Sequence, residues 1–130
     1  MKTTTAFSHT YTRIALTALS LFFYTAATQA QTKAQLKDSL KVATDRLEYA
    51  PDSVDLRLKK ASLNLQLEQW SYALDEYDLI LKYNPYNLAA LFYRAYTNEK
   101  LHRYKFARLD YENLLTIVPG HFEGQLGLAL

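Results

Sequence analysis

The side chains that most often carry chemistry in enzymes are few in this sequence and poorly grouped. Its three histidines, His9, His102 and His121, have no second histidine or carboxylate at a spacing that suits a metal site. Cysteine is absent, which excludes disulfide bonds, thiol catalysis, a cysteine-based metal site and a lipid-modified cysteine anchor. We therefore expect no metal and no cofactor.

Acidic side chains cluster within residues 75–78 and 110–112, on segments that also carry lysine and asparagine. Such a mixture is typical of a solvated helix face. No G-x-S-x-G motif, phosphate-binding loop or Ser/His/Asp grouping occurs, and only three glycines are present. The sequence predicts a non-catalytic protein. An enzyme stays open only as a catalytic part that would follow residue 130.

The first thirty residues differ from the rest. Lys2 and Arg13 supply positive charge, and no acidic residue precedes Asp38. Residues 14–27 form a mostly apolar run, and Thr-Gln-Ala at residues 28–30 places small side chains where a signal peptidase reads them.

This pattern predicts a secretory signal peptide over residues 1–30, cleaved after about Ala30, and a secreted or periplasmic mature protein. The apolar run is shorter than the roughly 20 residues that a membrane-spanning helix needs, so we expect no stable membrane anchor. A mitochondrial-type targeting segment is the alternative, because the start is rich in threonine and free of acid. Two basic residues and a continuous apolar block argue against it.

Removing residues 1–30 changes the charge balance. The full chain has 15 basic and 13 acidic residues, and Lys2 and Arg13 leave with the signal peptide, so the two signs balance in the mature part. The pI of 8.7 therefore belongs largely to the removed segment. Without a basic cluster larger than Lys59-Lys60, a nucleic-acid partner is not expected.

An internal repeat dominates residues 33–130. Pro51, Pro85 and Pro119 are spaced by 34 residues. The same step relates small to small and aromatic to aromatic residues, as in Ala61, Ala95 and Ala129, Ser39, Ala73 and Ala107, Leu47, Leu81 and Leu115, Trp70 and Tyr104, and Tyr77 and Tyr111. A fixed period of this length indicates stacked supersecondary units.

Each unit is predicted to contain two helices. Residues 88–101 and 104–118 run without glycine or proline, and residues 102–103 mark a turn between them. Ala95 and Ala107 put small side chains on the facing helices, so that the two backbones can approach closely. Apolar spacing of Leu36, Leu40, Ala43 and Leu47 predicts one more helix before the first unit.

Aromatic residues are expected to surround the contact between paired helices: Trp70 and Tyr104 at the start of the second helix, Tyr77 and Tyr111 farther along it. Each proline then ends a unit, because it lacks a backbone donor and disfavours helix in the preceding residue.

The residues two positions after each proline are predicted helix N-caps. Ser53 and Asn87 are good cap residues, whereas His121 is a poorer one.

The 34-residue unit resembles the tetratricopeptide repeat, whose pattern is W-x2-L-G-x2-Y, then A-x3-F, then P. This chain matches it at Ala61, Ala73-x3-Tyr77 and Pro85, and again at Ala95, Ala107-x3-Tyr111 and Pro119. The resemblance implies an all-α fold, an α-solenoid of antiparallel helix pairs. After the predicted signal peptide (1–30), it divides the chain into a leading helix (31–52), two complete units (53–86 and 87–120) and the start of a third (121–130).

Departures from the family pattern recur in both units. Arg57 and Leu91 replace its first aromatic, Lys60 and Arg94 its leucine, and Asn64 and Asn98 its tyrosine. Acidic residues recur too, at Glu76 and Asp110. Because the basic and acidic changes occur together twice, we predict the ion pairs Lys60–Glu76 and Arg94–Asp110. Two solvated charges that never meet are the alternative.

The last nine residues begin a third unit without its second helix. Phe122, Leu126 and Leu130 are therefore expected to lack a packing partner. We interpret this end as a fragment of a longer chain, or else as a short closing helix. An open edge of this kind would also allow self-association.

Aromatic residues that the repeat does not explain gather at Phe92, Tyr93 and Tyr96. In the tetratricopeptide family, this first-helix face lines the groove that binds partner peptides. The groove residues implied here are Ala89, Phe92, Tyr93, Tyr96, Glu99 and Lys100, with their equivalents one unit earlier, Asp55, Leu58, Lys59, Ser62, Leu65 and Gln66. Phe92 and Tyr96 packing merely on a neighbouring unit is the alternative.

The resemblance implies a scaffold or assembly module that holds another protein or peptide. Tyrosine and phenylalanine suit such a surface because they offer a large contact area at low entropic cost. A small-molecule or glycan-binding accessory subunit with an aromatic groove is the alternative. The lysine and asparagine clamp by which some family members bind a chaperone's C-terminal carboxylate has no match here.

Overall fold

The structure is a computed structural model that describes the backbone of residues 4–129 and the side chains of Thr25 and residues 27–129. Two compact units are present, residues 1–35 and residues 36–130. The described backbone contains six helices and no strand. The expected all-α class is thereby confirmed.

The first unit is the N-terminal part of helix α1 (Thr4–Tyr49). The predicted cleavage site after Ala30 lies inside this helix, and its side chains from residue 27 to residue 35 are all exposed. The side chains of residues 1–24, which include the apolar run up to that point, lie outside the described residues. No helix among the described residues is both long and apolar enough to span a membrane.

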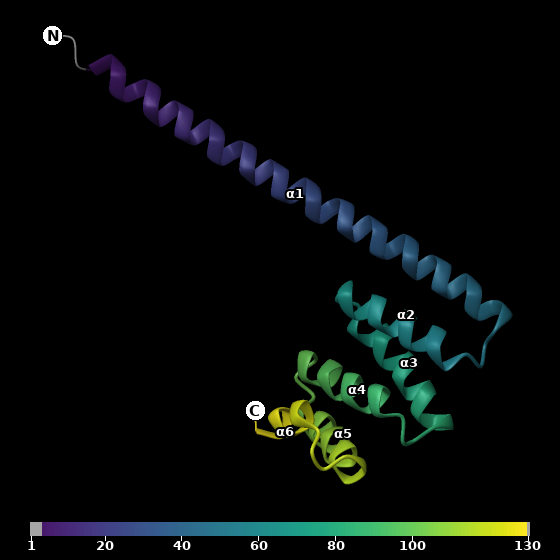
Figure 1. Ribbon diagram of the computed structural model, residues 1–130. Helices are drawn as coiled ribbons and strands as arrows, with labels where there is room; N and C mark the ends of the chain where they lie inside the picture. Colours follow the sequence, from purple (N-terminus) through teal and green to yellow (C-terminus); the bar gives the residue numbers. More distant parts are fainter. Residues whose placement is uncertain (1–3, 130) are drawn as a thin grey trace. The chain divides into compact units, whose positions relative to one another are not determined.

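The second unit holds the end of α1 and five further helices. They are α2 (Val54–Gln66), α3 (Trp70–Tyr83), α4 (Leu88–Lys100), α5 (Tyr104–Ile117) and α6 (Phe122–Ala129). Each helix from α2 to α6 packs against the next along the chain (Figure 1). The first helix of each repeat unit (α2, α4, α6) begins at residue 54, 88 or 122, and the second helix (α3, α5) begins at residue 70 or 104. The 34-residue step is therefore kept without insertion.

Side-chain caps start the first helices. Ser53 Oγ accepts a hydrogen bond from the Leu56 amide at 3.3 Å, and Asn87 Oδ1 accepts one from the Ala90 amide at 2.9 Å. Both predicted caps are confirmed. His121, expected to cap less well, accepts from the Gly124 amide through Nδ1 at 3.2 Å.

The core forms where paired helices meet. Ala61, Ala73, Ala95 and Ala107 are all buried and belong to one cluster, as the spacing of small residues predicted. Tyr77 and Tyr111 are also buried within it. At the end of α1, the predicted apolar stripe turns inward, with Ala43 and Leu47 buried and Leu36 and Leu40 half-buried.

The expectation for Tyr104 was wrong. Its side chain is 62% exposed, and its hydroxyl contacts His102 Nδ1 at 2.8 Å instead of filling the helix contact. Trp70, at the same repeat position, is half-buried. A position at the very start of a helix lies at the rim of the interface, where a ring can turn outward.

The turn inside each unit needs an unusual backbone conformation. Glu68 and His102, 34 residues apart, have φ values of 58° and 57°. This left-handed region suits glycine, and a side chain with a Cβ occupies it at a cost. The repeat therefore preserves a strained turn as well as its packing.

Candidate functional site

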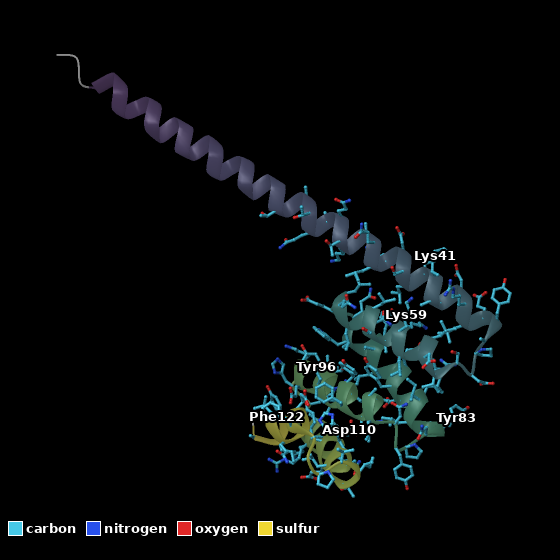
Figure 2. The ribbon with its side chains drawn as sticks, viewed as in Figure 1. Lys41, Lys59, Tyr83, Tyr96, Asp110 and Phe122 are labelled. Carbon is cyan, nitrogen blue, oxygen red and sulfur yellow. The ribbon has the colours of Figure 1, made fainter. Side chains whose placement is uncertain are left out.

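The predicted groove residues all lie on two first helices, six on α2 and six on α4. None of the twelve is buried. Figure 2 shows Lys59 on α2 and Tyr96 on α4, whereas Asp110 comes from the second helix α5. Seven of the set are exposed: Asp55, Lys59, Ser62, Gln66, Ala89, Tyr93 and Lys100. Five are half-buried: Leu58, Leu65, Phe92, Tyr96 and Glu99.

The ring of Phe92 packs partly against neighbouring side chains. Its ring lies 5.2 Å from the ring of Tyr93, 6.1 Å from Tyr111 and 5.8 Å from His121, measured between centroids. Leu58 and Leu65 likewise pack against the core cluster. Phe92 therefore packs mainly within its own unit, on Tyr93 and Tyr111, and reaches the next unit only at His121.

Tyr93 and Tyr96 offer more surface. Tyr93 is 44% exposed, with one side of its ring stacked on Tyr77 at 6.2 Å between centroids. Lys100 Nζ lies 5.0 Å from the centroid of the Tyr96 ring, a cation–π contact. The face thus combines aromatic surface with positive charge from lysines 59 and 100 and negative charge from Asp55 and Glu99.

Two tyrosines lie beneath this face. Tyr77 is 1% exposed, and its hydroxyl has no hydrogen-bond partner among the described residues. Burial raises the pKa of Tyr77 well above its ordinary range. Burial, together with the Glu99 carboxylate, likewise raises the pKa of Tyr111. Both phenols are therefore neutral at physiological pH.

The face of α6 was not among the predicted groove residues. Leu126 and Gly127 stand 34 residues after Phe92 and Tyr93, so α6 continues the surface of the first helices. The repeat period alone could have identified them. Leu126 and the neighbouring Phe122 are exposed, as expected for residues without a packing partner. Residue 130, expected to behave in the same way, lies outside the described residues.

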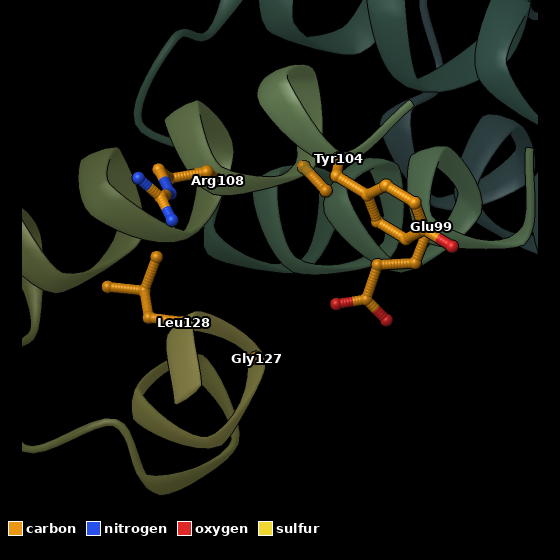
Figure 3. Close-up of a pocket in the computed structure, with 6 residues that line it drawn as sticks. Glu99, Tyr104, Arg108, Gly127 and Leu128 are labelled. Carbon is orange, nitrogen blue, oxygen red and sulfur yellow. The ribbon is translucent and has the colours of Figure 1, made fainter. Parts of the chain in front are cut away.

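A pocket of about 310 Å³ opens between α4, α5 and α6. Its lining is Glu99, Tyr104, Ala107, Arg108, Gly127 and Leu128. In Figure 3, Glu99, Tyr104 and Arg108 lie on one side, and Gly127 and Leu128 of α6 lie on the other. Through Glu99, this pocket adjoins the predicted groove residues.

Both predicted ion pairs are confirmed. Lys60 Nζ lies 2.6 Å from Glu76 Oε1, and Arg57 Nη1 lies 3.0 Å from the other oxygen of the same carboxylate. Arg94 donates to Asp110 through Nη2 at 2.6 Å and Nε at 2.8 Å. Because Arg94 forms two parallel bonds, its geometry is that of a bidentate pair.

Arg94 also reaches the preceding helix pair. Its Nη1 donates to Asp78 Oδ1 on α3 at 2.7 Å. Hydrogen bonding to Asp110, and secondly to Asp78, raises the pKa of the Arg94 guanidinium. The arginine therefore remains charged, and it joins α4 to both α3 and α5.

The described residues hold no group of three or more histidine, cysteine, aspartate or glutamate side chains placed to bind a metal ion. The carboxylates of Glu76, Asp78 and Asp110 on the second helices are instead engaged with cations of the first helices. What the arrangement can do chemically is bind, through aromatic contact, hydrogen bonds and paired charges.

Comparison with known proteins gives similarity in structure alone. No family model and no curated protein matches the sequence. A tetratricopeptide repeat protein from Parabacteroides merdae ATCC 43184 is 25% identical, with a TM-score of 0.71 over 76% of this chain. This chain covers 39% of that protein.

Two further solved structures are similar. The first TPR of Spaghetti (RPAP3), bound to the HSP90 peptide SRMEEVD, is 21% identical with a TM-score of 0.70, covering 75% of this chain and 78% of that one. The Arabidopsis OM64 TPR domain is 19% identical with a TM-score of 0.67, covering 75% and 81%. The chain has the tetratricopeptide repeat fold, an α-solenoid of helix pairs.

Proposed function

We propose that this solenoid is a non-catalytic scaffold that binds another protein or a peptide along the face of α2 and α4. Tyr93 carries the proposal: it is a large aromatic side chain, stacked on the core and yet 44% exposed. A ring held in place loses little entropy on binding, which is why such residues dominate binding energies at interfaces. The peptide complex of the similar RPAP3 domain supports the same kind of partner.

The charged side chains of this face indicate what charge pattern a bound segment should have. Lys59 and Lys100 are exposed, and Asp55 and Glu99 lie on the same helices. Since opposite charges balance, a segment of mixed charge with an aromatic or aliphatic anchor fits better than a strongly acidic or basic one.

Site-specific photocrosslinking tests the assignment. A photoreactive phenylalanine in place of Tyr93 or Lys59 should crosslink to a partner in cell-envelope extract. The same group in place of Tyr86, exposed in the loop before α4, is the matched control. Crosslinks of equal yield to the same protein from Tyr86 would contradict the groove assignment.

Loss of binding gives the second test. Tyr93→Glu should abolish recovery of that partner, because it puts a charge into an aromatic contact, while Tyr86→Glu should leave recovery unchanged. Circular dichroism checks that both variants stay folded. If Tyr93→Glu recovers the partner as wild type does, binding occurs elsewhere.

We also propose that the protein is exported and that residues 1–30 are removed. The support is the basic start, the apolar run of residues 14–27 and the small residues before Gln31. Intact mass and N-terminal sequencing of the protein purified from its native host should give Gln31 as the first residue. A cytoplasmic protein that retains Met1 would refute export.

Self-association through α6 is the remaining part of the proposal. Phe122 and Leu126 are exposed on this helix, and apolar contact between copies would cover them. Sedimentation velocity should show a concentration-dependent dimer that Leu126→Glu converts to monomer. A monomer at all concentrations refutes it.

A further inference from the structure

Two pockets away from the groove face are built from equivalent residues. The first, about 460 Å³, is lined by Leu40, Thr44, Lys60, Asn64, Gln69, Tyr72, Asp75 and Glu76. The second, about 310 Å³, is lined by Leu74, Asp78, Arg94, Asn98, Arg103, Phe106, Leu109 and Asp110. Every residue of the second stands 34 positions after its counterpart in the first. Neither pocket shares a residue with the twelve predicted groove residues.

The departures from the tetratricopeptide pattern line these pockets. Where the pattern has leucine, the pockets have Lys60 and Arg94, and where it has tyrosine, they have Asn64 and Asn98. Asparagine is much smaller than tyrosine, so the exchange leaves space, and it lines that space with polar atoms. Both exchanges occur in both units.

Each pocket contains one asparagine, Asn64 or Asn98, at a largely buried position. Asn64 is 2% exposed and Asn98 is 6% exposed. Neither side-chain amide is a fully enclosed orphan, since the Tyr77 hydroxyl is the one such atom among the described residues, and each amide instead lines a pocket, where it can donate two bonds and accept two. Two equivalent amides that line equivalent pockets place the same hydrogen-bonding group where a ligand with hydrogen-bonding groups could reach it.

The charged groups indicate that the ligand is uncharged. Glu76 is neutralised by Lys60 and Arg57, and Asp110 by Arg94. Arg103 adds a cation to the second pocket and Asp75 adds an anion to the first, whereas their counterparts, Gln69 and Leu109, are uncharged. No excess of positive or negative charge is shared by the two pockets, so neither an anion nor a cation is favoured.

Each pocket is lined in part by an aromatic side chain that is largely exposed to solvent. Tyr72 lines the first and Phe106 the second, at equivalent positions, and both are exposed. An exposed aromatic face beside fixed hydrogen-bonding groups matches a ligand with one apolar side and several hydroxyls. Pyranose rings have this construction: their axial C–H groups stack on aromatics, while their hydroxyls both donate and accept.

We propose that the two pockets are carbohydrate-binding subsites, each taking a sugar unit of a neutral glycan. The amide of Asn64 or Asn98 bonds the sugar hydroxyls, and Tyr72 or Phe106 stacks on its ring. The ion-paired carboxylates hold their positions and offer remaining lone pairs to hydroxyl donors. This site is distinct from the groove face, so it succeeds or fails independently of the proposed protein partner.

NMR titration of the isotope-labelled protein tests the proposal. The probes are maltotetraose, cellotetraose, xylotetraose and mannotetraose, each added to millimolar concentration. At least one should shift the side-chain amide signals of Asn64 and Asn98 and the ring signals of Tyr72 and Phe106. The groove signals of Tyr93 should not move. If none of the four shifts the asparagine amides, the proposal is refuted.

Substitutions give the matched controls. Asn64→Leu and Asn98→Leu fill each pocket with an apolar side chain and should abolish the shifts at that pocket. Asn113→Leu, at an exposed site outside both pockets, should leave them intact. Phe106→Ala should weaken binding at the second pocket about tenfold, equal to about 1.4 kcal/mol, whereas Tyr86→Ala should not.

Two outcomes contradict the ligand class. Binding that persists in the doubly substituted Asn64→Leu/Asn98→Leu variant places the sugar elsewhere. Shifts of both asparagine amides by an extended peptide, but by no sugar, assign the pockets to a protein partner. Thermal denaturation of each variant confirms that loss of binding is not loss of folding.

Discussion

At the residue scale, several side chains occupy conformations or surroundings that a more stable protein would avoid. The buried hydroxyl of Tyr77 has no partner among the described residues, and Glu68 and His102 hold left-handed backbone conformations. The left-handed turns recur at the repeat step. Each of these features leads to a measurable effect on the free energy of unfolding.

Tyr77→Phe should raise the unfolding free energy at pH 7 by about 1 kcal/mol, because it removes a buried donor that finds no acceptor. Urea denaturation measures the change. Tyr72→Phe, on an exposed tyrosine of the same helix, is the control and should change little. A destabilised Tyr77→Phe protein would mean that the hydroxyl is satisfied in solution.

Alkaline pH should destabilise the fold through the same tyrosine and its repeat equivalent. The pKa values of Tyr77 and Tyr111 are raised in the folded protein, whereas unfolded tyrosine titrates near pH 10. Each neutral phenol therefore contributes its full share to the free energy of unfolding below about pH 10. That share is lost as the pH rises toward the pKa of the tyrosine in the folded protein.

Above about pH 10, the free energy of unfolding should fall by about 1.4 kcal/mol per pH unit for each of the two tyrosines. Denaturation of wild type, Tyr77→Phe and Tyr111→Phe at about pH 9, 10 and 11, on either side of the unfolded pKa, measures it. Each substitution should flatten the slope. Equal slopes in all three proteins would refute the assignment.

The left-handed turns predict a stabilising exchange. Glu68→Gly and His102→Gly relieve a backbone cost of about 1–2 kcal/mol, offset in part by the greater entropy of unfolded glycine. We expect a net gain of about 0.5–1 kcal/mol for each by thermal denaturation. Gln69→Gly and Arg103→Gly, one position later and without positive φ, should destabilise instead.

At the scale of helices, ion pairs and small residues set how the elements meet. The sequence predicted the pairs Lys60–Glu76 and Arg94–Asp110 because the same two departures from a family pattern occurred twice. It did not reveal that Arg57 and Asp78 also join these pairs. Those contacts depend on where long side chains turn after the helices have packed.

Asp110→Ala should lower the unfolding free energy by about 3 kcal/mol, because it leaves the partly buried Arg94 with only the exposed Asp78 as partner. The i,i+4 pair of Lys41 with Asp45 is exposed on both sides. Asp45→Ala should therefore cost less than about 0.5 kcal/mol. Similar losses in the two variants would show that the Arg94 pair is only a surface contact.

Gly127 tests the docking of α6. Tyr111 lies against it where, one repeat earlier, the ring of Tyr77 stacks on Tyr93. A Cβ at Gly127 would overlap the Tyr111 ring, so Gly127→Ala should destabilise the protein by about 1–3 kcal/mol despite the better helix propensity of alanine.

Gly120→Ala is the matched control, because a Cβ there meets no atom within 4 Å and its φ is not positive. Its unfolding free energy, measured by urea denaturation, should stay within about 0.5 kcal/mol of wild type. If Gly127→Ala is equally harmless, α6 does not pack on Tyr111 in solution.

At the scale of the whole molecule, the solenoid fold followed from the 34-residue period and from prolines, caps and small residues at fixed places in it. The candidate sites were less predictable. Tyr104 turned outward, Phe92 joined the packing, and the paired pockets at Asn64 and Asn98 were not foreseen. A sequence shows which residues are small or polar, but neighbouring side chains decide whether the resulting space is filled.

Stability should vary along the molecule, since each repeat contacts only its neighbours. Core residues concentrate in α3, α4 and α5, whereas Gly124 is the only buried residue among those described in α6. In hydrogen exchange at neutral pH, amides of α6 should exchange at least about tenfold faster than those of α3–α5. Uniform protection would indicate a single cooperative unit.

The unbroken register of the helices makes the repeats interchangeable in a genetic sense. Deleting residues 54–87 would join Ser53 directly to Leu88, and Ser53 would cap α4 as it now caps α2. Duplicating the same segment would lengthen the array by one unit. One recombination event could thus add or remove a whole repeat, and with it a whole pocket, without a new junction sequence between the units.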